Sequence, residues 1–161
     1  MDCADYLGEP VKITVATLAD MSDWVQLRLA LWPDTGREEH EVEVAGILDR
    51  PGETLNLIAR LYDGRAVGLA EASLRHDYVN GCDSSPVAFL EGIYVADAHR
   101  REGIAGQLVK AVELWAQAQG CAELASDTNI ANSQSQALHV SLGFAETQRV
   151  VYFRKLLPKS E

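Results

Sequence analysis

The residues from Arg100 to Gly106 combine basic and small side chains where a strand is expected to give way to a helix. Their pattern is Arg100-x-x-Gly103-x-Ala105. Backbone N–H groups at a helix start lack partners within the helix, and the helix dipole is positive there. Small residues let a phosphate approach that backbone, and arginine adds charge. The segment suits a pyrophosphate, although an ordinary structural turn remains an alternative; it lacks the G-x-G-x-x-G of a dinucleotide site.

The composition indicates one globular domain over residues 1–161 with a net charge of −10. This charge is unlike that of most nucleic-acid-binding proteins and suits a polycationic substrate, but it also simply aids solubility. No apolar run is long enough to span a membrane, and the amino-terminal residues do not resemble a signal peptide, so a cytoplasmic location is expected. The three cysteines are expected to be free thiols, and the four histidines have no metal-ligand spacing.

A strand and two helices are expected at the start of the chain. Val11–Ala16 alternates as a strand does, and Thr17 and Asp20 have the spacing of a capping box for a helix that Pro33 ends. A second helix is expected over residues 37–49. The residues expected to point inward are Leu18, Met21, Val25 and Leu29 in the first helix and Val42, Ala45 and Leu48 in the second. Trp24 and Trp115 are expected in the core.

The remaining chain alternates between strands and helices. Asp63-Gly64 predicts a hairpin turn, and residues 76–86 form a polar loop. Strands are expected over Leu55–Tyr62, Ala66–Arg75, Val87–Val95, Glu123–Thr128 and Ala145–Phe153, and helices over Gly103–Gln119 and Asn132–Leu142. This order predicts an α/β fold in which a mixed sheet has helices on both faces.

The order of elements and two motifs resemble the GCN5-related N-acetyltransferase (GNAT) superfamily over nearly the whole chain. The first motif, Q/R-x-x-G-x-G/A, is matched at positions 100, 103 and 105. The second motif, N-x-x-A…L-Y-x-x-L-G-F, is matched at Asn132, Leu138, Leu142, Gly143 and Phe144, with Ser135 replacing alanine and His139 replacing tyrosine. The resemblance implies a mostly antiparallel sheet with a splayed parallel strand pair that binds acetyl-CoA.

Longer strings are similar to the bacterial aminoglycoside 6′-N-acetyltransferases of type I, most of all to the dimeric chromosomal kind. These strings are residues 73–82, 89–93 and 125–128, with Leu31-Trp32-Pro33. The resemblance implies a homodimer that transfers the acetyl group of acetyl-CoA directly to the 6′-amine of aminoglycoside antibiotics and so confers resistance. Two alternatives remain: the same fold acting on a polyamine or a protein N-terminus, and a non-catalytic domain that senses acetyl-CoA.

The resemblance also implies where acetyl-CoA binds. The cofactor would lie between two parallel strands that separate, ending near Val95 and Asp127, and its pantetheine arm would pair with the first of them as an added strand does. The residues assigned to cofactor binding are Ile93, Tyr94, Val95, Arg100, Arg101, Glu102, Gly103, Ile104, Ala105, Gly106 and Asn132.

Acetylation of an amine needs a group that accepts the amine's proton and a proton for the leaving thiolate. Glu91 interrupts an apolar strand and is the candidate base; the alternative is a carboxylate on an exposed strand face. Asp127 would bind the amino groups of the substrate; alternatively, it caps a turn. His139 would protonate the thiolate, a role that solvent can also fill.

Further side chains are assigned to the acceptor by the resemblance. Trp32 and Tyr78 would form walls against sugar rings, and Tyr78 could act in the active site of the partner subunit. His76 and Asp77 could line the same cavity, with loop solvation an equal alternative. Glu146 would add negative charge, and no metal site is expected.

Overall fold

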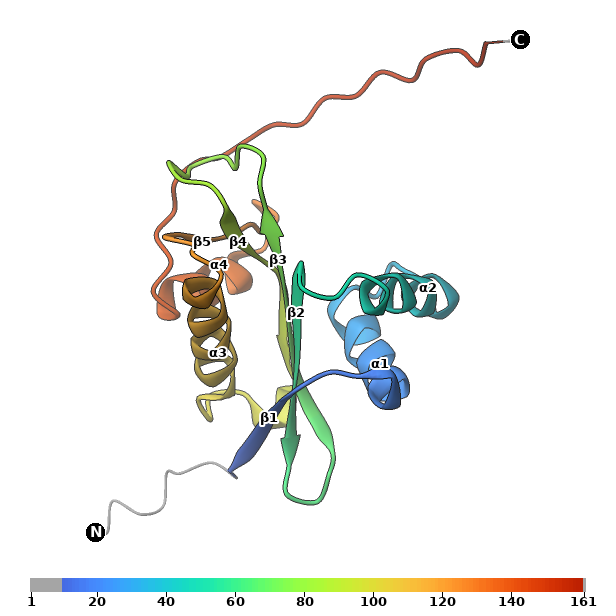
Figure 1. Ribbon diagram of the computed structural model, residues 1–161, viewed down its shortest axis with the longest axis vertical. Coiled ribbons are helices and arrows are strands. Elements are labelled where there is room, and N and C mark those ends of the chain that lie inside the picture. Colours follow the sequence, from blue (N-terminus) through green and yellow to red (C-terminus); the bar gives the residue numbers. More distant parts are fainter. Residues whose placement is uncertain (1–9, 161) are drawn as a thin grey trace. The chain divides into compact units, whose positions relative to one another are not determined.

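A computed structural model describes residues 10–160, and the chain divides into two compact units (Figure 1). The larger unit is Met1–Asp127 and the smaller is Thr128–Glu161, and each is described by itself. The amino-terminal residues on which the expectation of no signal peptide rests lie outside the described residues, as does Cys3. Cys82 and Cys121 are free thiols, as expected.

The larger unit contains a five-stranded sheet in the order β1-β2-β3-β4-β5. The strands are β1 (Val11–Val15), β2 (Thr54–Leu61), β3 (Ala66–Arg75), β4 (Val87–Val95) and β5 (Leu124–Ser126). The first four pair antiparallel, whereas β4 and β5 are parallel. This pair is short: only Ala88, Phe89 and Leu90 have partners in β5. The expected mixed, mostly antiparallel sheet with a parallel pair is therefore confirmed.

Helices cover both faces of this sheet, as predicted (Figure 1). The pair α1 (Met21–Leu31) and α2 (Arg37–Leu48) lies on one face, and α3 (Ile104–Ala118) lies on the other. Two short 3₁₀ turns, η1 (Leu18–Asp20) and η2 (Asp97–His99), precede α1 and α3. The predicted hairpin turn at Asp63-Gly64 and the end of α3 before Gly120 are confirmed, and both glycines have positive φ.

The capping box before α1 is also confirmed. The Thr17 backbone N–H donates a hydrogen bond of 2.8 Å to the Asp20 carboxylate. This bond is the main cause that lowers the pKa of Asp20. Trp24 is fully buried, and Trp115 is half-buried against a second cluster on the other face. Both tryptophans therefore lie in the core, as expected.

The predicted inward faces of the first two helices were correct only in part. Met21, Val25 and Leu29 pack in the core, but the side chain of Leu18 is 71% exposed. In α2 the prediction was wrong for Val42, which is 72% exposed, and for Ala45. The fully buried side chains of α2 are His40 and Val44, four residues apart, which is the spacing of one helical face.

The smaller unit contains one helix, α4 (Ser133–Ser141), close to its predicted bounds. The Asn132 side chain caps it by accepting a hydrogen bond from the Ser135 N–H, and Gly143 follows its end with φ of +92°. The strand predicted over Ala145–Phe153 is wrong, because residues 144–160 have no regular secondary structure. A strand needs a neighbour for its backbone groups, and none of the described residues supplies one to this segment.

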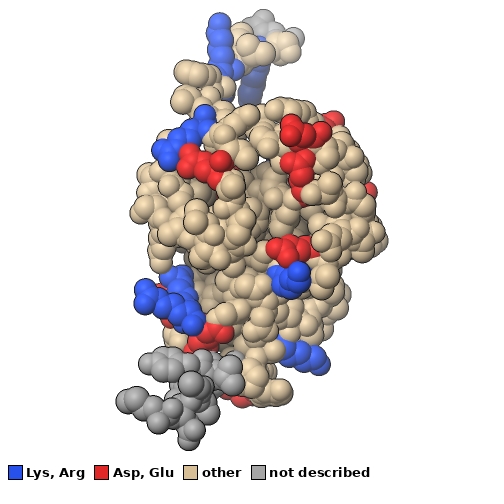
Figure 2. All heavy atoms as spheres, turned by 90° about the vertical axis from the view of Figure 1, so that its left-hand side faces the viewer, with Lys and Arg blue, Asp and Glu red and all other residues tan. Residues whose placement is uncertain are grey.

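Charged side chains are spread over the surface. On the face drawn in Figure 2, Lys and Arg side chains stand in small groups and do not form one continuous basic surface. Within residues 10–160, no helix combines the length and the apolar character needed to cross a bilayer. The same residues contain no cluster of three His, Cys, Asp or Glu side chains suited to a metal ion.

Candidate active site

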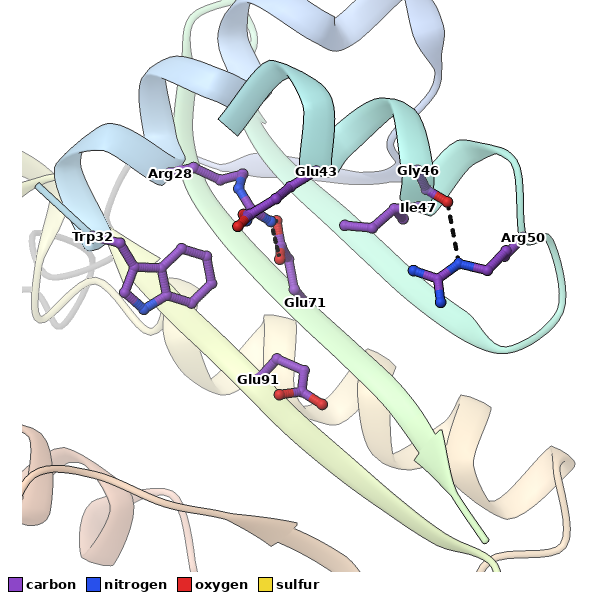
Figure 3. Close-up of a pocket in the computed structure, with 8 residues that line it drawn as sticks. All are labelled: Arg28, Trp32, Glu43, Gly46, Ile47, Arg50, Glu71 and Glu91. Atoms are coloured by element: carbon purple, nitrogen blue, oxygen red, sulfur yellow. Dashed lines mark hydrogen bonds and ion pairs between the residues drawn. The ribbon is translucent and has the colours of Figure 1, made fainter. Parts of the chain in front are cut away.

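A pocket of about 380 Å³ lies between the sheet and the helices α1 and α2 (Figure 3). It combines one aromatic ring with charged side chains of both signs. Its lining residues are Arg28, Trp32, Glu43, Gly46, Ile47, Arg50, Glu71 and Glu91. Trp32 and Glu91, predicted from the sequence as acceptor wall and base, are thus brought to the same pocket.

Glu91 lies at a β-bulge in β4. Leu90 pairs with Ala72 and Gly92 pairs with Glu71, so Glu91 is the extra residue without a partner in β3. The bulge breaks the alternation of the strand and leaves the Glu91 side chain 36% exposed between buried Leu90 and half-buried Gly92. Bulges often turn a side chain toward an active site, and this geometry favours the catalytic interpretation over an ordinary strand face.

Two side chains of β3 hold the Glu91 carboxylate. The Arg75 guanidinium donates to both carboxylate oxygens at 3.0 Å, and the Ser73 hydroxyl donates to one of them. Arg75 is itself placed by the Phe89 ring, whose centroid lies 3.5 Å from the guanidinium carbon. Glu91 is therefore held in one orientation, and a substrate ammonium group would share the carboxylate with Arg75.

Trp32 follows the last residue of α1 and its ring lies directly against the backbone of β4. A Cβ atom added at Gly92 would lie 2.5 Å from Cζ2 of Trp32 and 2.7 Å from Cδ2 of Leu31. Only a glycine fits this contact. Gly92 is a functional position that the sequence analysis missed, although a glycine inside an apolar strand is a recognised sign of a close approach.

A network of charged side chains forms part of the pocket lining and extends into the core. Arg28 donates from Nη1 to both oxygens of Glu71, at 2.8 and 2.6 Å, and from Nη2 to Glu43. Its Nε donates to Nδ1 of His40 at 3.1 Å, and Trp24 donates from its indole nitrogen to Glu71 at 2.6 Å. This network was not predicted from the sequence, although charged residues at positions 28 and 71 within otherwise apolar segments were a signal for it.

The β4 edge and the loop after it fit the predicted place for acetyl-CoA. Beyond Leu90, the β5-side edge of β4 has no strand partner near Ile93 and Val95 among the described residues, although the Val95 carbonyl accepts a hydrogen bond from Arg100. Arg101 and Gly103 have φ of +64° and +80°, and they turn the chain into α3. Within residues 10–160, none of the backbone N–H groups from Arg101 to Gly106 donates a hydrogen bond. Such a concave row of free N–H groups suits a pyrophosphate.

The charged side chains of this loop have different surroundings. Arg100 donates to the Val95 carbonyl at 3.0 Å and pairs with Asp97 at 2.9 Å, so its guanidinium anchors the end of β4. Glu102 is turned toward His99, 3.4 Å away. The side chains of Arg100 and Glu102 are therefore engaged within the loop. The backbone N–H groups are the feature of the loop that suits a phosphate.

The predicted acceptor residues of the loop 76–86 do not line the pocket. His76 lies 3.3 Å from the Glu53 carboxylate, and Tyr78 is 77% exposed. Asp77 is exposed as well. Their roles stay predictions.

Glu123, which directly precedes β5, holds the loop 76–86 in place by hydrogen bonds. The Glu123 carboxylate accepts hydrogen bonds from the backbone N–H groups of Asp83 and Ser84, at 2.9 and 2.8 Å, and from the Ser84 hydroxyl. These bonds, that of the Ser84 hydroxyl first, lower the pKa of Glu123.

The remaining predicted residues lie at the end of the larger unit or in the smaller one. Asp127 is exposed directly after β5. His139 contacts the Ser135 carbonyl at 2.7 Å through Nδ1, and its ring lies edge-on to Phe144. Asn132 caps α4, and Glu146 pairs with Arg149. Their assignment to the active site stays a prediction.

Comparison with known proteins identifies the family. Residues 20–144 match the model of the acetyltransferase (GNAT) family. The aminoglycoside N(6′)-acetyltransferase type 1 of Serratia marcescens is 54% identical over 145 residues, which cover 90% of this chain and 99% of that protein.

Solved structures agree with this match. The aminoglycoside antibiotic 6′-N-acetyltransferase AAC(6′)-Ih from Acinetobacter baumannii is 44% identical with a TM-score of 0.88, and the match covers 92% of this chain and 100% of that chain. AAC(6′)-Iy, in complex with the bisubstrate analogue CoA-S-monomethyl-acetylneamine, is also 44% identical, with a TM-score of 0.86 and coverage of 92% and 99%. The resemblances to the GNAT superfamily and to the aminoglycoside 6′-N-acetyltransferases of type I are thereby confirmed. The chain belongs to the GNAT family of acetyltransferases.

Proposed function

We propose that this protein transfers the acetyl group of acetyl-CoA to the 6′-amine of aminoglycoside antibiotics and thereby confers resistance. The observation that carries the proposal is the meeting of Trp32 and the bulged Glu91 in one pocket, beside the unpaired edge of β4. Relatives at 44–54% identity over most of the chain are named as aminoglycoside 6′-N-acetyltransferases and support this substrate class.

Acetyl-CoA and the acceptor sugar would bind to different parts of the site. Acetyl-CoA would pair with the backbone of β4 near Ile93 and Val95 and place its pyrophosphate on the N–H groups from Arg101 to Gly106. The CoA portion of the analogue bound to AAC(6′)-Iy supports this co-substrate. The acceptor sugar would lie against Trp32 with its ammonium group at Glu91.

The transfer proceeds without a covalent enzyme intermediate. Glu91 accepts one proton from the ammonium group and releases it to solvent, and the neutral nitrogen then attacks the thioester carbon. As the carbon–sulfur bond breaks, the nitrogen loses a second proton to Glu91, and the thiolate takes up one proton from His139 or solvent. Direct transfer is favoured over an acyl-enzyme, because burial raises the pKa of the Cys82 and Cys121 thiols and so disfavours nucleophilic thiolates.

Other residues would contact the substrate or take part in the dimer. Asp127 and Glu146 would bind further ammonium groups, and Asp77, His76 and Tyr78 would contact the drug from the loop 76–86. We also propose a cytoplasmic homodimer. Its support is a row of exposed apolar side chains in the extended carboxy-terminal segment: Val150, Val151, Tyr152, Phe153, Leu156 and Leu157.

The decisive experiment measures thiol release from acetyl-CoA by the purified protein with three acceptors. Kanamycin A carries the 6′-amine, its 6′-hydroxyl analogue lacks it, and spermidine is a polyamine of another class. Turnover with kanamycin A but not with its hydroxyl analogue is expected. Turnover with spermidine alone would favour a polyamine acetyltransferase, and cofactor binding without turnover on any amine would indicate a sensor.

A further inference from the structure

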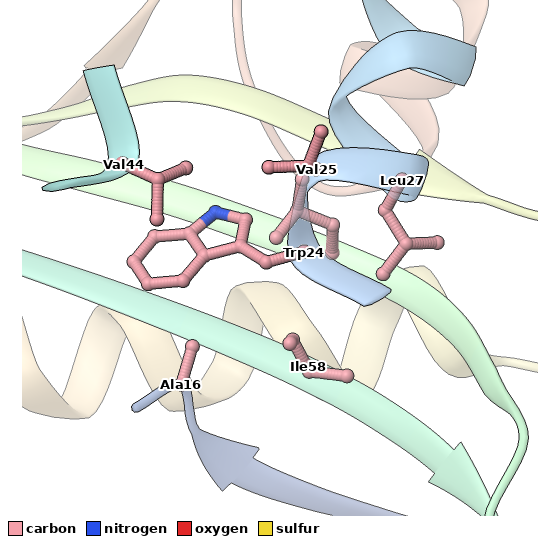
Figure 4. Close-up of a cluster of buried hydrophobic side chains, with 7 residues drawn as sticks. Ala16, Trp24, Val25, Leu27, Val44 and Ile58 are labelled. Atoms are coloured by element: carbon pink, nitrogen blue, oxygen red, sulfur yellow. The ribbon is translucent and has the colours of Figure 1, made fainter. Parts of the chain in front are cut away.

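His40 is a fully buried polar side chain between the acceptor pocket and the core. It lies on the inner face of α2, one turn before Val44, which packs in the cluster of Trp24 and Ile58 (Figure 4). Its side chain is 1% exposed. It does not line the pocket, and the transfer mechanism does not use it.

The hydrogen bonds of His40 fix its tautomer. Arg28 Nε can only donate, so Nδ1 of His40 must accept that bond of 3.1 Å. The ring therefore carries its proton on Nε2, which lies 3.2 Å from the carbonyl oxygen of Trp32 and donates to it. Trp32 directly follows α1, where carbonyl groups lack partners within the helix. Its carbonyl oxygen also accepts a hydrogen bond of 3.2 Å from the Thr35 N–H, so His40 is the second donor to it and the one that comes from α2.

The Trp32 ring is also contacted by neighbouring groups. The Arg28 guanidinium lies over it, 4.8 Å from the ring centroid, and the backbone of Gly92 lies against it. The His40 ring stacks beside it with a centroid distance of 6.4 Å. Arg28 is placed in turn by Glu71 and Glu43. His40 is thus the link that joins the buried charges to the main chain of Trp32.

We propose that His40 is a positioning residue: through Arg28 on one side and the Trp32 carbonyl on the other, it sets the aromatic wall against which the acceptor sugar binds beside Glu91. This inference rests on the proposed function for the identity of the acceptor. His40 itself touches neither substrate nor cofactor in this scheme.

Two substitutions separate the two hydrogen bonds of His40. The amide of His40→Asn can keep an acceptor near Nδ1 for Arg28 but does not reach the Trp32 carbonyl. The amide of His40→Gln reaches that carbonyl with a donor. The Michaelis constant for kanamycin A is expected to rise about tenfold in His40→Asn, as for the loss of one buried hydrogen bond. His40→Gln is expected to recover most of this loss, and the Michaelis constant for acetyl-CoA stays the same in both.

Controls distinguish positioning from general damage. Glu41→Gln, an exposed neighbour on α2, should match the unaltered enzyme. In a Trp32→Leu background, His40→Asn should cause no further rise, because its effect passes through Trp32. An equal rise in both backgrounds, or equal losses in His40→Asn and His40→Gln, would overturn the proposal.

A measurement that does not depend on turnover tests the position of Trp32 independently of the proposed function. With 5-fluorotryptophan incorporated, the fluorine NMR signal that Trp32→Leu removes is assigned to Trp32. We expect His40→Asn to shift or broaden this signal and His40→Gln to leave it near its original position. An unchanged signal in His40→Asn contradicts the positioning role. Absence of kanamycin turnover in the unaltered enzyme contradicts the proposed function instead.

Discussion

At the scale of single residues, the candidate site depends on one carboxylate and the glycine next to it. Glu91 was predicted as the base from its place in an apolar strand; the structure places it in the pocket wall, and its catalytic role stays a prediction. Its bulge and its contacts with Ser73 and Arg75 could not be predicted, because a bulge depends on the register between two strands. The role of Gly92 was also missed, because it depends on a ring 60 positions earlier in the chain.

Replacing Glu91 tests the proposed base. Glu91→Gln keeps the shape of the side chain and its bond from Ser73 but cannot accept a proton from the ammonium group. We expect kcat with kanamycin A to fall about 100-fold, while the dissociation constant of acetyl-CoA from calorimetry stays within twofold. Glu53→Gln, an exposed carboxylate, provides the control for loss of charge. Equal loss of turnover and of cofactor binding would show that Glu91 is structural.

Replacing Gly92 tests the contact with Trp32. The Cβ of Gly92→Ala collides with the indole and with Leu31, so one of them must move. We expect the free energy of unfolding in urea to fall by about 1–3 kcal/mol, the usual range for an overpacked site. The Michaelis constant for kanamycin A should rise in parallel.

Gly46→Ala gives the matched comparison. A Cβ there meets no atom within 4 Å, and the position lies inside α2. This substitution should therefore stabilise the protein by about 0.5–1 kcal/mol. If Gly92→Ala were equally well tolerated, the close approach of Trp32 would not be needed for the fold.

At the scale of elements, the helices and the strands β1 to β5 were predictable from local patterns, but the buried face of α2 was not. Residues with helical spacing occur on two faces of α2, and the apolar Val42 indicated a face that is exposed in the structure. The buried face contains His40, whose burial is compensated by a hydrogen bond from Arg28 in the neighbouring helix α1. A histidine on a buried face is satisfied only by tertiary contacts, which single-sequence patterns do not contain.

The loop 76–86 gives a prediction about pH. Its anchor Glu123 has a lowered pKa in the folded protein, so the carboxylate stabilises the loop fully above its ordinary pKa of 4.5. This contribution is lost as the pH falls through the lowered value. We expect hydrogen exchange of residues 80–85, corrected for the intrinsic rate, to show weaker protection at low pH.

Variants at position 123 check this assignment. Glu123→Ala should show the weakened protection already at neutral pH, and its loop should no longer respond to acid. Glu113→Ala, which removes an exposed carboxylate from α3, should keep the response of the unaltered protein. A loop that responds to acid equally in all three proteins would mean that another group anchors it.

At the scale of the whole molecule, the last predicted strand marks the limit of reasoning from one chain. The residues 145–153 have a strand-like pattern, yet they have no strand partner among the described residues. The sequence pattern shows which secondary structure a segment can form. A strand also needs a neighbouring strand for its backbone hydrogen bonds, and a second copy of this chain is one source of such a neighbour.

The homodimer can be tested at this segment. We expect the protein to have twice the mass of one chain in size-exclusion chromatography with light scattering. Val151→Asp combined with Phe153→Asp places charge on exposed apolar positions and should yield the monomer. Val140→Asp, on an exposed position of α4, should leave the dimer intact. A doubly substituted protein that remains dimeric would place the interface elsewhere.

The two halves of the candidate site differ in how they would respond to selection. The acceptor pocket is lined by side chains, so single substitutions in α1 and α2 can change which drugs are accepted. The edge of β4 and the loop from Arg101 to Gly106 offer mainly main-chain groups, which most substitutions preserve; the exceptions are proline and larger side chains at the small residues of the loop, such as Gly103 with its positive φ. An inhibitor designed to bind that edge through main-chain hydrogen bonds would therefore be open to escape by few point mutations.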